Sequence, residues 1–90
     1  RDIAPQAPKH VLVIPKGDYV SMDDFSEKAS DAELAAFLRA VGKVARMEGV
    51  ADSGYRVIAN HGGDAMQEVF HFHMHVLGGG AMKGLVRLAE

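Results

Sequence analysis

The chain has 90 residues, of which 48% are hydrophobic and 24% charged, and its net charge is -2. This composition is typical of a single globular domain over residues 1–90 and argues against a disordered, collagen-like or membrane-spanning chain. The charge balance argues against a nucleic-acid partner, and the absence of cysteine excludes disulfides and thiolate metal sites. We expect a cytoplasmic protein.

The front of the chain predicts an irregular segment followed by a strand. Two prolines, Pro5 and Pro8, interrupt residues 1–9, and proline removes backbone donors. The β-branched run that follows, His10 to Pro15, predicts a strand buried on both faces that ends where Pro15 cannot donate. Residues 21–28 show too little periodicity to predict more than a short helical turn or a loop.

One long helix is predicted from Ser30 onward. Ser30 and Glu33 form a capping-box signature, in which each side chain can satisfy a backbone donor at the start of a helix. Apolar residues then recur at three- and four-residue spacing, which indicates one face packed in the core or in a dimer interface; they are Leu34, Phe37, Leu38, Val41, Val44 and Ala45. Gly49 ends the helix.

The rest of the chain predicts two more strands. Tyr55 to Ala59 is the first, residues 60–66 form a glycine-rich loop, and Val69 to Leu77 alternates strictly before Gly78 to Gly80 break the pattern. The simplest arrangement is an α+β fold in which one main helix packs across an antiparallel sheet.

Three histidines alternate along the last predicted strand. Because alternate side chains of a strand point to opposite faces, we expect one face to be core and the other chemical. The core side would carry Phe70, Phe72, Met74 and Val76, and the chemical side His71, His73 and His75. Three adjacent imidazoles would repel one another if charged, so a row of them indicates a functional role rather than a merely polar surface.

Two kinds of chemistry fit this row. Two neighbouring histidines could bind zinc with a third ligand from another strand, for which His10 is the candidate. A row of neutral imidazoles suits an extended anion better, since one ring can attack phosphorus while another donates to phosphate oxygens. The upstream loop, Asn60 to Asp64, could present backbone N–H groups to such an anion.

The residues also resemble a known family. His71-Phe-His-Met-His75-Val-Leu-Gly-Gly79 resembles the His-x-His-x-His signature of the histidine triad family, and its Val-Leu-Gly-Gly ending is similar to the Hint-like branch. The segments from Asp2 to Lys16 and from Tyr55 to Asn60 are similar to strands of the same branch, so the resemblance spans nearly the whole chain.

The resemblance implies a purine nucleoside phosphoramidase that cleaves the P–N bond of nucleoside phosphoramidates, or related acyl-adenylates, without a cofactor or metal. His73 would be the nucleophile that forms a nucleotidyl-histidine intermediate, and His75 would contact the phosphate and assist the leaving group. His71 and His10 would orient the reactive rings. The resemblance also implies a dimer-forming, histidine triad-like fold that works as a homodimer.

The resemblance further assigns residues to substrate binding. Asp2 would accept the ribose hydroxyls, Ile3 would lie beside base and ribose, and Asn60 would contact the phosphate region. Glu68 and Met66 stand where the branch often has Ser and Gly that contact phosphate, although an inward carboxylate would repel it.

Two alternatives stay open at this point. The chain could be a histidine-based zinc-binding module, or a nucleotide-binding dimer without catalysis. Family members also usually carry several tens of residues before the point that matches Arg1, so we expect a domain that lacks the N-terminal segment of the family.

Overall fold

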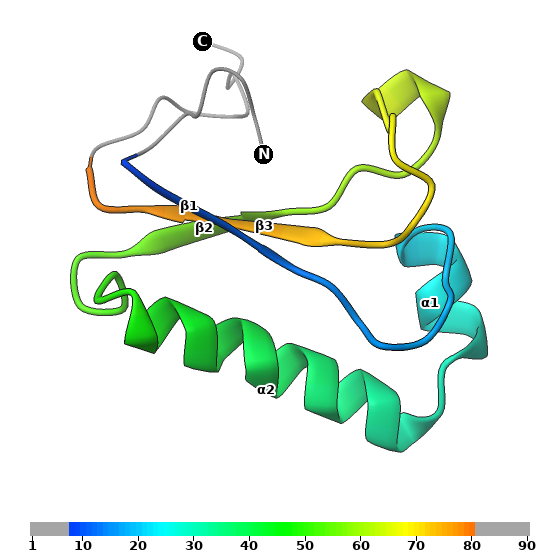
Figure 1. Ribbon diagram of the computed structural model, residues 1–90, viewed down its shortest axis with the longest axis horizontal. Helices are drawn as coiled ribbons and strands as arrows, with labels where there is room; N and C mark the ends of the chain where they lie inside the picture. The colour runs from blue at the N-terminus through cyan, green and yellow to red at the C-terminus, as the bar shows by residue number, and fades with distance from the viewer. Residues whose placement is uncertain (1–7, 81–90) are drawn as a thin grey trace, which may run out of the picture.

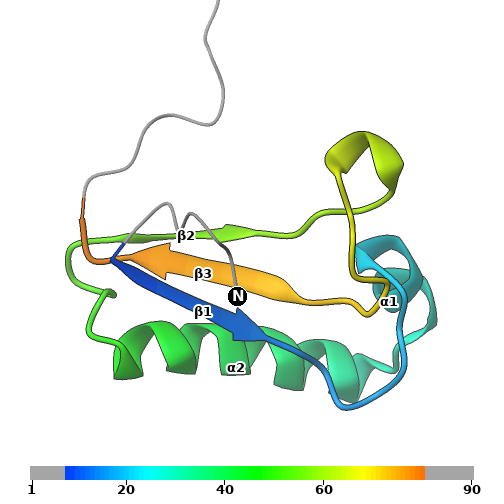
Figure 2. The same cartoon turned by 45° about the horizontal axis from the view of Figure 1, so that its top comes forward.

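Three short strands form one antiparallel sheet in the computed structural model, which describes residues 8–80. They are β1 (Lys9–Val13), β2 (Tyr55–Ile58) and β3 (Met74–Gly78). The order is β1-β3-β2, so the last strand along the chain lies between the other two, as Figure 2 shows. Val76 marks the register, because it pairs with Val11 on one side and Val57 on the other.

Helix α2 (Asp31–Met47) crosses one face of this sheet and packs against β3 and β1 (Figure 1). The predicted capping box starts it: the Glu33 N–H donates to Ser30 Oγ over 3.1 Å, and the Ser30 N–H donates to Glu33 Oε1 over 2.9 Å. After Met47 the chain turns through Gly49, whose φ of 76° favours glycine. Both predicted ends of this helix are confirmed.

The core lies between α2 and the sheet and includes a cluster of three phenylalanine rings. Phe25 and Phe72 are stacked with centroids 4.9 Å apart, and Phe37 lies 5.1 Å from each of them. From the predicted stripe of α2, Phe37, Val41 and Ala45 are buried, and Leu34 and Val44 pack against the cluster. Leu38 was predicted with them but is 68% exposed.

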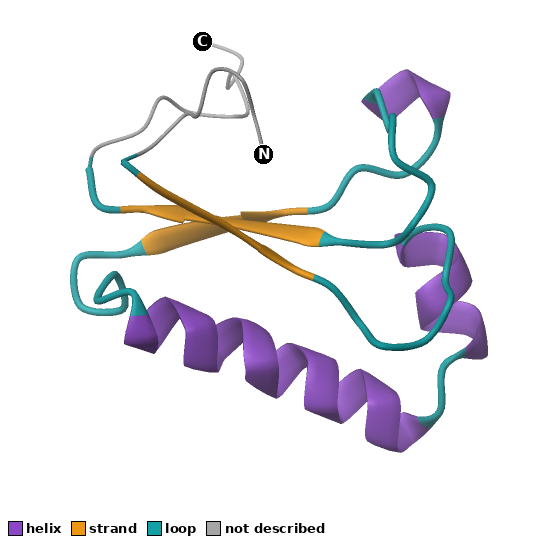
Figure 3. Ribbon diagram, viewed as in Figure 1, coloured by secondary structure: helices purple, strands orange, loops and turns teal. Residues whose placement is uncertain are grey.

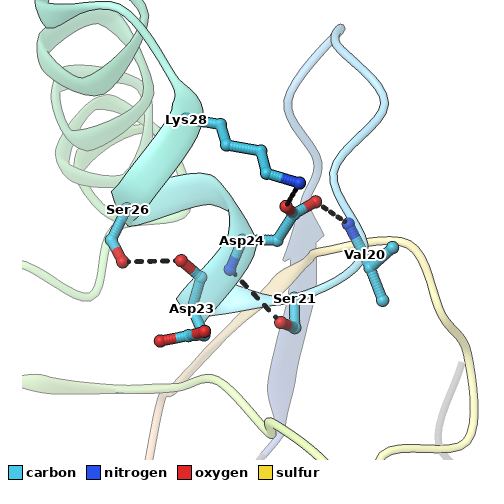
Figure 4. Close-up of polar contacts among 6 residues, drawn as sticks. All are labelled: Val20, Ser21, Asp23, Asp24, Ser26 and Lys28. Carbon is cyan, nitrogen blue, oxygen red and sulfur yellow. Dashed lines mark hydrogen bonds and ion pairs between the residues drawn. The ribbon is translucent and has the colours of Figure 1, made fainter.

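A short helix, α1 (Met22–Lys28), covers one end of the sheet beside the start of α2 (Figure 3). Figure 4 shows its first turn, where the Asp24 N–H donates to Ser21 Oγ and Asp24 Oδ2 accepts from the Val20 N–H. Lys28 pairs with Asp24 over 2.9 Å. This backbone hydrogen bond from Val20, followed by the contact with Lys28, holds the pKa of Asp24 below its ordinary value. Of the short helical turn or loop predicted over residues 21–28, the structure forms a capped helix of 7 residues.

The third predicted strand is wrong over its first half. It was expected from Val69 but begins at Met74, because both neighbouring strands end there: β1 pairs no further than Val13 with Met74, and β2 no further than Ile58 with His75. Before that point the chain bonds to a loop instead, since the Phe72 N–H donates to the carbonyl of Tyr19 over 2.6 Å.

Two predictions about burial are also wrong. Phe70, expected in the core, is 66% exposed because it precedes the strand that would have fixed its direction. β1 is not buried on both faces: it pairs only with β3 within residues 8–80, and of its five residues only Val13 is buried.

The predicted α+β class with a helix across an antiparallel sheet is confirmed. No helix within residues 8–80 is long and apolar enough to span a bilayer.

Candidate active site

Two histidines meet on the face of the sheet opposite α2. Opposed residues of antiparallel strands point to the same face. Val13 and Val76 lie in the core beneath α2 and Met74 packs against it, so the pairs Val11 with Val76 and Val13 with Met74 belong to the α2 face. His10 and His75 alternate with these residues and so share the other face. Their rings lie 5.0 Å apart, and His10 Nε2 is 2.8 Å from His75 Nδ1, a hydrogen bond between β1 and β3.

His73 immediately precedes β3 and lies beside His75. The two ring centroids are 5.1 Å apart with an interplanar angle of 72°. Nδ1 of His73 is 2.8 Å from the backbone carbonyl of His71. Because a carbonyl oxygen only accepts, His73 Nδ1 carries the proton and donates it, and the other ring nitrogen, Nε2, keeps its lone pair.

His71 plays a different part from the other three. Its Nε2 donates to the backbone carbonyl of Gly17 over 3.3 Å, which directs the ring toward the loop between β1 and α1. The structure therefore brings together the rings of His10, His75 and His73, and His71 contributes its carbonyl to the cluster. Within residues 8–80, no three histidine, aspartate or glutamate side chains gather in an arrangement that could hold a metal ion.

The glycine-rich loop upstream closes on itself. It contains a single 3₁₀ turn, η1 (Gly63–Ala65), and the Asn60 side-chain amide donates to the carbonyl of Ala65 over 2.8 Å. The Gly62 N–H, which was predicted to be available to an anion, donates to Gln67 Oε1 over 2.9 Å. This donor of the predicted anion site is therefore used within the loop.

Gln67 is a structural residue that the sequence did not reveal. It is only 7% exposed, and its amide group donates to the carbonyl of Val20 over 2.7 Å and to that of Val69 over 3.1 Å. With the bond from Gly62, it ties the loop to the N-terminus of α1. A glutamine between an exposed methionine and an exposed glutamate carries no periodic signal of burial.

The remaining predicted binding residues are placed as follows. Asp2 and Ile3 lie outside the described residues, and Glu68 is exposed. A cavity of about 360 Å³ lies between the end of β1 and α2, where its lining includes Val13 to Gly17, Phe37 and Ala40 but none of the four histidines. It is thus separate from the histidine cluster.

The sequence matches a family model, that of the HIT domain, over residues 1–82. The chain belongs to the histidine triad (HIT) family. This confirms the resemblance inferred from the residues around His73.

Curated HIT relatives are similar over most of the chain. A HIT-like protein of Azospirillum brasilense is 62% identical over 78 residues, which cover 87% of this chain and 64% of that protein. The purine nucleoside phosphoramidase of Escherichia coli K12 is 46% identical over 82 residues, covering 88% of this chain and 66% of that enzyme. The chain thus spans about two thirds of the length of these two relatives.

Solved HIT structures share the fold. A histidine triad protein from Clostridium difficile matches with a TM-score of 0.77 and 36% identity, over 94% of this chain and 73% of that one. A HIT family hydrolase from Clostridium thermocellum matches with a TM-score of 0.76 and 39% identity, over 97% of this chain and 75% of that one. The sheet and helix described above are therefore those of a HIT fold.

Proposed function

We propose that this chain is a hydrolase that cleaves the P–N bond of purine nucleoside phosphoramidates, or related acyl-adenylates, with His73 as nucleophile. The observation that carries the proposal is the 2.8 Å hydrogen bond from His73 Nδ1 to the carbonyl of His71. It fixes the tautomer in which Nε2 has a lone pair ready to attack, with no proton to remove first. A relative 46% identical to this chain is a purine nucleoside phosphoramidase.

His10 and His75 have complementary roles in this scheme. His10 Nδ1 is buried and has no hydrogen-bond partner among the described residues. A proton there would be a buried donor without an acceptor, which is rare and costly. We therefore assign the His10 proton to Nε2, which donates to His75 Nδ1. The proton of His75 then lies on Nε2, where it can donate to a phosphate oxygen and stabilise the charge that develops there.

The reaction proceeds in two displacements. In the first, the lone pair of His73 Nε2 forms a bond to phosphorus, the P–N bond to the amine breaks, and the departing nitrogen takes a proton from solvent. In the second, a water oxygen attacks phosphorus, the bond to His73 Nε2 breaks and restores the lone pair, and a water proton returns to solvent. The net change is the addition of one water across the P–N bond.

Substrate binding and assembly complete the proposal. Asp2 accepts the ribose hydroxyls, Ile3 lies beside base and ribose, and Asn60 and Glu68 border the phosphate region. Asn60 is held by its bond to Ala65, within the loop that precedes the histidines. The protein works as a homodimer, and the apolar side chains of β2 and α2 that stand exposed in one chain, including Val57 and Leu38, support this.

The test is turnover of an adenosine phosphoramidate, followed by chromatography of released nucleoside monophosphate. Replacing the nucleophile in His73→Asn should lower kcat by at least about 10³-fold. His61→Asn is the matched control, because His61 is exposed and lies outside the cluster. Mass spectrometry of wild type denatured at alkaline pH, where a bond between phosphorus and imidazole nitrogen survives, should show one nucleotidyl group, absent in His73→Asn.

The outcomes separate this proposal from its rivals. Equal turnover by His73→Asn and His61→Asn would eliminate the nucleophile assignment. Saturable nucleotide binding by wild type with neither turnover nor adduct would identify a binding protein instead. Stoichiometric zinc whose removal lowers the melting temperature would point to the metal-binding module.

A further inference from the structure

The loop between β1 and α1 holds the histidine segment in place through its backbone. This 16–20 loop supplies two carbonyls: that of Gly17 accepts from His71 Nε2, and that of Tyr19 accepts from the Phe72 N–H over 2.6 Å. His71 in turn supplies the carbonyl that fixes the His73 tautomer. The position of His73 therefore depends on the position of the 16–20 loop.

The start of the 16–20 loop is not closely packed from beneath. Lys16 and Gly17, with Pro15 just before the loop, line a half-open cavity of about 360 Å³ that α2 borders on the other side. A stretch beside an open cavity has fewer packing contacts than one in a filled core. The contacts of the Tyr19 side chain, both polar and apolar, therefore help to fix the loop.

One polar contact ties this loop to the first turn of α2. The Tyr19 hydroxyl donates to Glu33 Oε2 over 2.8 Å, while Oε1 of the same carboxylate closes the capping box with Ser30. The Tyr19 ring lies against Gly17, where an added Cβ would stand 2.7 Å from Tyr19 Cε2. It also meets Phe25 edge-on at 5.0 Å, and Phe25 stacks on Phe72.

We propose that Tyr19 and Glu33 form a positioning pair that anchors the 16–20 loop to α2 and thereby orients His71 and His73. Tyr19 touches no reacting atom in this scheme: it acts through the carbonyls of Gly17 and Tyr19. Its effect on turnover rests on the function proposed above, whereas its effect on the imidazole rings does not. Neither residue was a candidate for the site from sequence, where Glu33 was assigned to the helix cap alone.

The contact shifts the pKa values of both partners in opposite directions. The backbone hydrogen bond from Ser30, followed by the Tyr19 hydroxyl, lowers the pKa of Glu33. The same contact raises the pKa of the Tyr19 hydroxyl, because it stabilises the protonated phenol.

The experiment compares variants that remove this contact with variants that leave it. Tyr19→Phe removes only the hydroxyl, and Glu33→Ala removes its acceptor. Glu33→Gln is the conservative rescue, since its amide can still accept from Ser30 and donate to the phenol oxygen. Ser30→Ala is the matched control: it removes the other half of the capping box and leaves the Tyr19 contact intact.

Two measurements are made on each variant. Steady-state kinetics with adenosine phosphoramidate should show kcat lowered about 10-fold in Tyr19→Phe and Glu33→Ala, with KM within about twofold of wild type, because a small misplacement of a nucleophile affects the chemical step. Glu33→Gln and Ser30→Ala should stay near wild type. Nitrogen-15 spectra of the ligand-free protein should show His73 as one Nδ1–H tautomer in wild type and as a mixture in Tyr19→Phe.

The inference is overturned if Tyr19→Phe keeps the wild-type His73 tautomer, or if Ser30→Ala lowers kcat as much as Tyr19→Phe does. If wild type turns over no phosphoramidate, the proposed function fails. The tautomer comparison in the ligand-free protein still decides the positioning role.

Discussion

Met66 offers a direct test of backbone strain next to the histidine segment. Within residues 8–80 it is the only non-glycine residue with positive φ, at φ 61° and ψ 39°. Its side chain is 76% exposed, so truncation removes little buried surface. The left-handed conformation costs an L-residue about 1.5 kcal/mol, and the greater freedom of glycine in the unfolded chain offsets about 0.7 kcal/mol of that. Met66→Gly should therefore stabilise the fold by about 0.8 kcal/mol.

The measurement is urea unfolding of wild type, Met66→Gly and Met66→Ala, with thermal unfolding as a second readout. For a domain of this size, about 0.8 kcal/mol corresponds to a rise in melting temperature of roughly 3–6 °C. Met66→Ala loses the same side chain but keeps the strained φ, so it should show no gain. If Met66→Gly is no more stable than Met66→Ala at equal urea dependence, the explanation by strain is wrong.

Two further predictions concern the polar ties of the loops. Gln67→Ala leaves the Gly62 N–H and the carbonyls of Val20 and Val69 without their partner, which should cost about 2–3 kcal/mol of unfolding free energy at about 1 kcal/mol per bond; a loss below about 0.5 kcal/mol in urea unfolding would contradict it. Glu33 has its pKa lowered below the ordinary 4.5 by the Ser30 N–H first and the Tyr19 hydroxyl second. Its contribution to stability is thus complete above the unfolded-state pKa and is lost as pH falls through the lower folded-state value. The stability difference between wild type and Glu33→Gln should shrink on acidification, and a difference that does not depend on pH would refute the linkage.

The parts of the fold that follow from local rules could be predicted from the sequence. Helix α2 begins where Ser30 and Glu33 predict and ends at Met47, just before Gly49, because capping and left-handed glycine act through neighbouring residues. β2 likewise occupies Tyr55–Ile58 within the predicted stretch. Such signals do not depend on what lies elsewhere in the chain.

Strand length could not be predicted, because it depends on partners. The alternation from Val69 onward matches a strand, but pairing is possible only where a neighbour runs alongside. The neighbours of β3 end at Val13, opposite Met74, and at Ile58, opposite His75. Phe72 is buried as the alternation predicts, although it pairs with no neighbouring strand. Its ring stacks on Phe25, and its N–H donates to the carbonyl of Tyr19. The periodicity thus predicted the burial of Phe72 correctly and its pairing in the sheet incorrectly.

The same distinction holds in the histidine cluster. The alternating spacing predicts which histidines belong to the site, but the tautomer of each ring depends on a hydrogen-bond partner. That partner is the His71 carbonyl for His73 and the His10 ring for His75. These partners are in turn held by groups with no recognisable motif, such as the Gly17 carbonyl, 54 residues from His71 in sequence. The ring orientation of His73, the nucleophile proposed from its sequence pattern, would therefore depend on a loop that the pattern does not mark. Substitutions in that loop should alter the chemistry of His73 without touching the triad.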